Sequence, residues 1–155
     1  MAQQLWLLRH GEAVPHDAAP DDKRELTERG RNQSRSAGRA LKALDVEVHL
    51  CLTSPKARAR ETAELACEAL GVEPVNEQAL AEGFDGRVAL DLMAATGPDQ
   101  RVLVVGHEPD FSQAVFDLTG ARIDMKKGGV AGVRLDGSRG ELIVLLRPRE
   151  LDRIR

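Results

Sequence analysis

Short apolar runs alternate along the chain with segments of helical periodicity. The runs that are apolar almost throughout, and therefore predict buried strands, cover residues 3–9, 46–53 and 101–106. The predicted helices cover residues 26–44, 54–70, 87–95 and 110–118. A short strand at 74–75 and a hairpin of residues 129–135 and 141–146 complete the pattern. Strands that alternate with helices are typical of an α/β domain.

Local signals set several helix ends. Thr27 is the expected N-cap of the first helix. Ser54 followed by Pro55 predicts the start of the second helix, because serine caps helices and proline suits their first turn. Gly71 is expected to stop that helix, and residues 80–86 form a loop before the third.

Composition narrows the class of protein. The 155 residues predict a single domain spanning 1–155, with a core that needs no disulfide or metal. A net charge of −3 and only four aromatic side chains, one Trp and three Phe, argue against a nucleic-acid partner. Cys51 and Cys67 lie in apolar contexts and are expected to be reduced core residues. With no signal peptide or membrane-spanning run in the sequence, we expect a cytoplasmic protein without a membrane partner.

Polar side chains follow each of the three apolar strands at its carboxyl end. Arg9 and His10 follow the first, Ser54 and then Arg58 the second, and His107 the third. Ligands of open α/β sheets bind outside these strand ends, so the arginines and histidines are expected to share one crevice. The helix that begins near residue 55 would point its N-terminal backbone donors into the same crevice, which suits an anion.

Two arginines and two histidines without a nearby pair of acids indicate phosphoryl chemistry. A guanidinium group matches phosphate oxygens, and a neutral imidazole can attack phosphorus to form a phosphohistidine. Neighbouring guanidinium groups would depress the pKa of that imidazole and keep it neutral. Such a site requires no metal and no cofactor, and none is expected. Gly11 would let the backbone turn behind His10 and leave room for phosphate.

Four segments carry a resemblance to a known family. They read LLRHGEA, LTERGRNQS, TSPKARARETA and VVGHEP in chain order. Together they resemble the histidine phosphatase superfamily, formerly called phosphoglycerate mutase-like, and in particular its small SixA-type phosphohistidine phosphatases. The resemblance extends from residue 5 to about residue 135. It implies a three-layer α/β/α sandwich with a mostly parallel central sheet, an antiparallel edge strand and no large cap domain.

The resemblance also implies roles for the strand-end residues. His10 would be the nucleophile, Arg9 and Arg58 would clamp the phosphate, and His107 would polarise the phosphoryl group. The family's proton donor is an acidic residue in a loop after the second helix, and Glu82 is the best positional match.

Several of these residues also have simpler interpretations. Asp85 is a weaker candidate than Glu82 for the acid. Ser54 is first a helix cap and second a phosphate contact. Arg58 alone would read as part of a solvated basic helix face, and His107 as a turn before a helix.

Other polar residues are expected to lie outside the catalytic set. His16 and His49 are interpreted as structural. Residues 21–25 are expected at the surface, where they could border the pocket. Lys126 and Lys127 are interpreted as a solvated turn in preference to a contact with a partner's phosphate.

The leading hypothesis is a metal-independent phosphatase that acts on phosphohistidine in a protein, such as a histidine phosphotransfer domain, through a phosphoenzyme on His10. The short interval 59–106 predicts an open pocket, as a protein-borne phosphate requires. The alternative is a phosphatase for small phosphomonoesters of sugars or metabolites, and a noncatalytic phospho-binding module ranks third. No GxxxxGK or GxGxxG motif follows a strand, so nucleotide binding is set aside. A monomer is favoured, while the pathway that the enzyme serves stays open.

Overall fold

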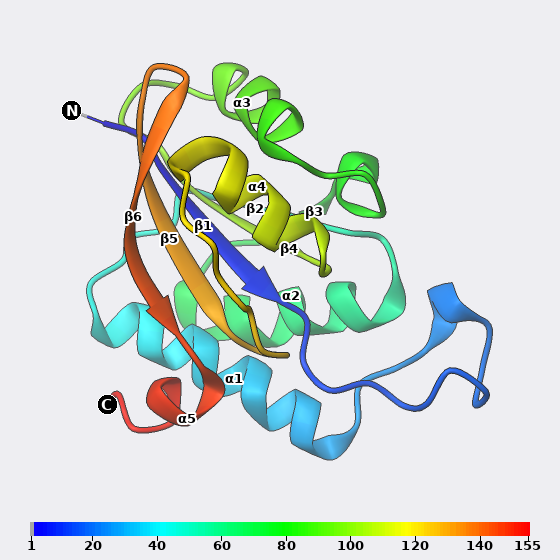
Figure 1. Cartoon of the computed structure of the whole chain (residues 1–155). Coiled ribbons are helices and arrows are strands. Elements are labelled where there is room, and N and C mark those ends of the chain that lie inside the picture. Colours follow the sequence, from blue (N-terminus) through cyan, green and yellow to red (C-terminus); the bar gives the residue numbers. More distant parts are fainter. Residues whose placement is uncertain (1) are drawn as a thin grey trace.

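The computed structural model describes residues 2–155 and is built on one six-stranded sheet (Figure 1). The strands are β1 (Gln4–Arg9), β2 (Leu50–Thr53), β3 (Pro74–Asn76), β4 (Arg101–Gly106), β5 (Val130–Asp136) and β6 (Arg139–Leu146). Their order across the sheet is β3-β2-β4-β1-β5-β6. Strands β3, β2, β4 and β1 run parallel to one another. Strand β5 is antiparallel to β1, and the edge strand β6 is antiparallel to β5.

Helices cover both faces of the sheet. They are α1 (Glu28–Ala43), α2 (Ala57–Leu70), α3 (Gly86–Ala94), α4 (Asp110–Thr119) and α5 (Pro148–Leu151), with short 3₁₀ turns η1 (Asp21–Lys23) and η2 (Gln78–Leu80). Helices α1, α2 and α5 lie on one face, and α3 and α4 lie on the other (Figure 1). This arrangement confirms the predicted three-layer sandwich, and no large cap domain is inserted within residues 2–155.

The alternation of side chains along β1 explains why this strand is apolar throughout. Leu5 and Leu7 pack into the core beneath α3 and α4, whereas Trp6 and Leu8 pack against α1 and α2. Successive residues of a strand point to opposite faces, so a strand with helices on both sides has no position left for a polar residue.

Helices α1 and α2 pack with their backbones close together. A Cβ atom at Gly38 of α1 would lie 2.2 Å from the carbonyl oxygen of Ala66 in α2, so only glycine fits there. The predicted helix ends are confirmed at both helices. The Thr27 side chain accepts a hydrogen bond from the Gly30 N–H, and α2 stops at Gly71, whose φ is +72°.

Two predicted boundaries were wrong by several residues. Strand β2 begins at Leu50 and not at Val46, because the Val46 N–H still donates to the carbonyl of Leu41 as the chain leaves α1. Helix α2 begins at Ala57 and not at Ser54. The Ser54 N–H donates to the carbonyl of Val105, which keeps that residue extended beside β4. No helix in residues 2–155 combines the length and the apolar character that a membrane crossing needs.

Candidate active site

The register of the central strands brings the two histidines together. Arg9, the last residue of β1, pairs with Gly106, the last residue of β4. The residue that follows each strand is a histidine, so His10 and His107 lie at the same edge of the sheet. The His10 N–H donates to the Gly106 carbonyl at 3.0 Å, and the ring centroids of His10 and His107 lie 5.2 Å apart.

Arg58 joins the site from the first turn of α2, next to the end of β2. Arg58 is 6% exposed, and its charge lowers the pKa of both histidines, after the larger effect of burial. The sequence therefore correctly placed His10, Arg58 and His107 on one site, and Arg9 belongs to it through the same strand end. The Arg9 guanidinium is fixed by donating from Nη1 to the Met125 carbonyl at 2.8 Å.

The environment of His10 selects both its charge and its tautomer. Burial, followed by the charges of Arg58, Arg9 and Arg24, lowers the pKa of His10 to about 3, against the opposing hydrogen bond to Gly11. The imidazole is therefore neutral at physiological pH. Its Nδ1 lies 2.7 Å from the Gly11 carbonyl oxygen, which can only accept a hydrogen bond. Nδ1 thus carries the proton, and Nε2 keeps a free lone pair.

His107 is held by a hydroxyl group. Burial, with the neighbouring His10 and Arg58, lowers the pKa of His107 to about 3. Its Nε2 lies 2.8 Å from Oγ of Ser54, a fully buried residue whose hydroxyl can donate to Nε2 while its oxygen accepts from the Lys56 N–H. Ser54 therefore orients His107, a contact that the sequence did not predict.

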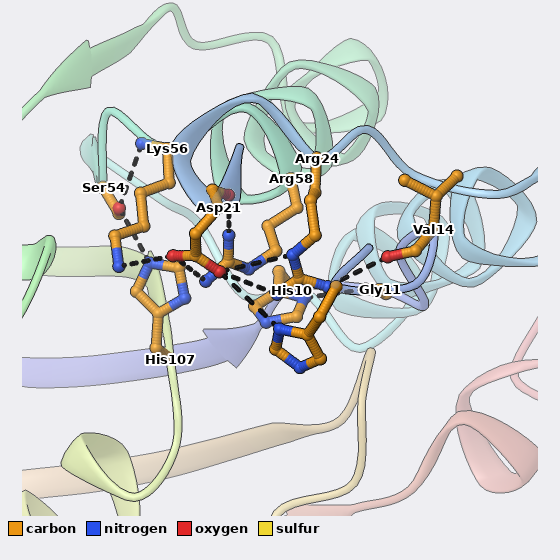
Figure 2. Close-up of polar contacts among 10 residues, drawn as sticks. His10, Gly11, Val14, Asp21, Arg24, Ser54, Lys56, Arg58 and His107 are labelled. Atoms are coloured by element: carbon orange, nitrogen blue, oxygen red, sulfur yellow. Dashed lines mark hydrogen bonds and ion pairs between the residues drawn. The ribbon is translucent and has the colours of Figure 1, made fainter. Parts of the chain in front are cut away.

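Asp21, the first residue of η1, lies among the cationic side chains. Its carboxylate is 3.2 Å from Nζ of Lys56, 3.4 Å from Nη2 of Arg58 and 3.1 Å from Nη2 of Arg24 (Figure 2). The Arg58 Nη1 also donates to the Asp21 carbonyl at 2.7 Å. Although partial burial raises it, the pKa of Asp21 falls to about 2 because of these cations.

Arg24 is a third guanidinium beside the site. The sequence pattern placed residues 21–25 at the surface, but Arg24 is only 8% exposed and donates to the Val14 carbonyl at 2.9 Å. Its charge contributes to the lowered pKa of His10. No local signal could have revealed this, because Arg24 becomes buried only when the loop folds back over α2.

Gly11 is required by a close approach of two backbones. A Cβ atom there would lie 2.5 Å from the carbonyl oxygen of Gly30 at the start of α1. The Gly11 N–H donates to Oγ1 of Thr62 in α2 at 3.1 Å. Gly11 therefore packs the chain after His10 against α1 and α2, a reason that differs from the expected room for phosphate.

The two candidate acids differ in their surroundings. Asp85 is the N-cap of α3 and accepts from the Val88 N–H at 3.0 Å, so its carboxylate has a structural partner. Glu82 is exposed in the loop between η2 and α3, with no hydrogen bond or ion pair to another residue of 2–155. This loop adjoins the end of β4, since the Leu80 carbonyl would lie 3.6 Å from a Cβ at Gly106.

Comparison with protein families agrees with this geometry. The profile of the histidine phosphatase superfamily (branch 1) matches residues 5–89, which is more than half of the chain. The chain belongs to the histidine phosphatase superfamily. As a member of this superfamily it is a phosphatase, an enzyme that hydrolyses phosphoryl groups.

Individual relatives of this histidine phosphatase cover most of its length. Phosphohistidine phosphatase SixA of Escherichia coli is 34% identical over 142 aligned positions, which cover 87% of each chain. An uncharacterized protein of Picosynechococcus is 34% identical over 166 positions, covering 96% of this chain and 98% of the relative. The structure of protein histidine phosphatase SixA complexed with tungstate superposes with a TM-score of 0.87 at 30% identity, covering 96% and 99% of the two chains. The resemblance to SixA-type enzymes is thereby confirmed.

Proposed function

We propose that this histidine phosphatase removes the phosphoryl group from phosphohistidine in a protein and that His10 carries the group as a covalent intermediate. The observation that supports this most directly is the state of His10. Its imidazole is neutral, its Nδ1–H is bound to the Gly11 carbonyl, and its Nε2 is free beside His107 and the arginines. Such a nitrogen is a ready nucleophile toward phosphorus.

In the first step His10 Nε2 attacks the phosphorus atom of the substrate. A new N–P bond forms, and the bond from phosphorus to the substrate's imidazole nitrogen breaks, leaving the electron pair on that nitrogen. This imidazole can be protonated before the bond breaks, which weakens the need for a strong general acid. In the second step a water oxygen attacks the phosphorus atom, and the bond from phosphorus to His10 Nε2 breaks with its electron pair left on Nε2. Inorganic phosphate leaves with the protons of the water, and His10 returns to its neutral form.

The remaining side chains stabilise charge on the transferring group. Arg9 and Arg58 are the proposed clamps on its oxygens, and His107 is the proposed third donor. Three buried nitrogens within residues 2–155 have no hydrogen-bond partner: Nε of Arg9, Nε of Arg58 and Nδ1 of His107. Unpaired buried nitrogens are unfavourable, and the oxygens of a bound phosphoryl group are acceptors of the kind that these donors lack.

We assign Glu82 a conditional role as proton donor. Its carboxyl group is exposed, has no hydrogen bond or ion pair to another described residue, and belongs to the loop that follows Leu80 beside the end of β4. With a phosphate ester the leaving oxygen needs a proton, whereas a phosphohistidine needs this help less. Glu82→Gln should therefore reduce hydrolysis of esters more than that of phosphohistidine.

Two features favour a protein substrate over a small phosphomonoester. Only β3, η2 and α3 lie between α2 and β4, so no inserted domain closes over the strand ends. The Escherichia coli relative is named phosphohistidine phosphatase SixA, and the tungstate complex is described as protein histidine phosphatase SixA. A small phosphomonoester could also enter an open site, and substrate preference must decide between the two.

The test compares a phosphorylated histidine phosphotransfer domain with a panel of sugar phosphates. We expect the phosphoprotein to give the higher kcat/KM, and a preference for the sugar phosphates would contradict the proposed substrate. With labelled phosphoprotein and an alkaline quench, which preserves N–P bonds, the label should appear on His10. His10→Ala should lose at least a thousandfold in kcat and carry no label. His49→Gln, at the opposite end of β2, is the control.

A further inference from the structure

A basic groove adjoins the phosphoryl site on the side of α1 and α5. This hollow of about 490 Å³ is lined by the cationic side chains of Arg9, Arg29, Lys126, Lys127, Arg147 and Arg149. Glu12 is the one carboxylate among the lining residues. The whole chain has a net charge of −3, so the concentration of positive charge here is local and not a general property of the surface.

The groove is fixed relative to the nucleophile by backbone hydrogen bonds. The Gly128 N–H, directly after the two lysines, donates to the carbonyls of both Arg9 and His10, each at 3.0 Å. Arg9 in turn donates to the Met125 carbonyl. The turn that carries Lys126 and Lys127 is therefore attached to the end of β1, and a ligand bound there has a defined position beside His10.

Most of the groove cations are available to a ligand. Lys127 is exposed and has no ion pair with any residue of 2–155. Arg29 and Arg149 have only long contacts of 3.8 Å, to Glu12 and Glu150 respectively. Lys126 is paired with Asp124 at 2.7 Å, but both side chains are largely exposed. Exposed pairs of this kind contribute little and exchange readily for another carboxylate.

The shape of the groove suits a polypeptide better than a small molecule. A second hollow of about 500 Å³ shares Arg29, Gln33, Pro148 and Arg149 with the first and continues between α1 and α5 as far as Asp152. The resulting surface is long, and its cations other than the half-buried Arg9 are exposed. The phosphoryl site differs in this respect, because Arg58 and both histidines are buried.

We propose that the basic groove docks an acidic segment of the phosphorylated protein, next to its phosphohistidine. This inference rests on the proposed function and adds the surface by which the enzyme recognises its protein substrate. Carboxylates of the partner would contact Lys127, Arg29 and Arg149 while the phosphohistidine reaches His10. Complementary charge of this kind raises the rate of encounter and selects among partners.

The test measures a specificity ratio, kcat/KM for a phosphorylated histidine phosphotransfer domain divided by kcat/KM for free phosphohistidine. The domain is chosen to have carboxylates beside its phosphohistidine. The variant Lys127→Glu/Arg149→Glu should lower this ratio about tenfold, chiefly through KM, and raising the salt concentration should narrow the difference. The control Lys42→Glu/Arg87→Glu makes the same change in charge far from the groove and should leave the ratio within about twofold of wild type.

A domain with those carboxylates changed to amides supplies the reciprocal arm. With the wild-type enzyme, its kcat/KM should fall toward that of free phosphohistidine. Its kcat/KM should be the same with the groove variant as with wild type. If the ratio is unchanged in the groove variant while wild type hydrolyses the phosphoprotein well, the groove inference is wrong and the proposed function stands. If wild type hydrolyses only small phosphates, both are wrong. A groove variant that loses activity toward small bisphosphates and not toward the protein would assign the groove to a metabolite instead.

Discussion

A hydrogen bond to a neighbouring carbonyl determines which nitrogen of His10 can react. The Gly11 carbonyl holds the proton on Nδ1, and buried surroundings with three nearby guanidinium groups keep the ring neutral. His107 experiences similar burial but is oriented by the Ser54 hydroxyl. Two residues of the same type thus have different partners, which is consistent with one acting as the proposed nucleophile and the other as the proposed donor.

The lowered pKa values predict how these rings titrate. Because burial and positive charge lower the pKa of His10 and His107 to about 3, both rings should stay neutral from pH 8 down to pH 5. Proton NMR of the free enzyme should show no titration of either ring in that interval. Added inorganic phosphate should raise the pKa of at least one ring, because a nearby anion favours imidazolium. A midpoint near 6.5 in the free enzyme would contradict the burial argument.

The residues that the sequence could not place show the limit of local patterns. Arg9, His10, Arg58 and His107 stand at the ends of apolar strands or one turn beyond, so parallel pairing alone brings them together. Arg24 does not follow a strand, so strand pairing does not place it at the site. It lies in a polar run whose composition is that of a surface loop, and its burial depends on how that loop folds over α2.

At the scale of elements, η1 places a carboxylate among the cations of the site. Asp21 lies among Lys56, Arg58 and Arg24, so its carboxylate competes with any anion for the same groups. Asp21→Asn should therefore tighten inhibition by inorganic phosphate, about three- to tenfold. Asp22→Asn, the adjacent exposed carboxylate, is the matched control. An inhibition constant equal to that of wild type would show that Asp21 does not compete with phosphate.

The contact between α1 and α2 provides a second prediction at this scale. In an exposed helix, Gly→Ala gains about 1 kcal/mol in helix propensity. At Gly38 the new Cβ would meet the Ala66 carbonyl at 2.2 Å, and separating the helices should cost about 1–3 kcal/mol more than that gain. Urea unfolding should show Gly38→Ala destabilised. Gly97→Ala, whose Cβ would meet its nearest neighbour at 3.6 Å, should be close to neutral.

Helix ends were predicted correctly where they depend on neighbouring residues, and less accurately where contacts with distant parts of the chain determine them. The Thr27 cap and the Gly71 stop follow from their own hydrogen bonds and dihedral angle, and both were predicted. The start of α2 was predicted too early, because Ser54 stays extended beside Val105 while its hydroxyl contacts His107. The local sequence Ser54-Pro55 gives no sign that the Ser54 hydroxyl will hydrogen-bond to His107, 53 positions later in the chain.

For the whole molecule, the same two histidines predict sensitivity to acid. Their pKa values are about 3 in the folded chain and near 6.5 when unfolded, so the unfolded chain binds more protons between these values. The free energy of unfolding should therefore fall as the pH drops below about 6.5. The expected loss between pH 7 and pH 5 is about 2 kcal/mol for each histidine.

Urea unfolding at the two pH values checks this prediction. His10→Gln should show about half of the wild-type pH dependence, since one of the two buried rings is then absent. A variant with the same pH dependence as wild type would rule out a contribution from His10.

Strand β1 comes from the first ten residues but lies in the interior of the sheet, between β4 and β5. A ribosome therefore releases the reactive imidazole well before either of the strands that flank it. Until then His10 has neither the Gly106 carbonyl nor the Gly128 amide against its backbone. Nascent chains that end before β5 should consequently be inert, and activity should begin only after both flanking strands have been synthesised.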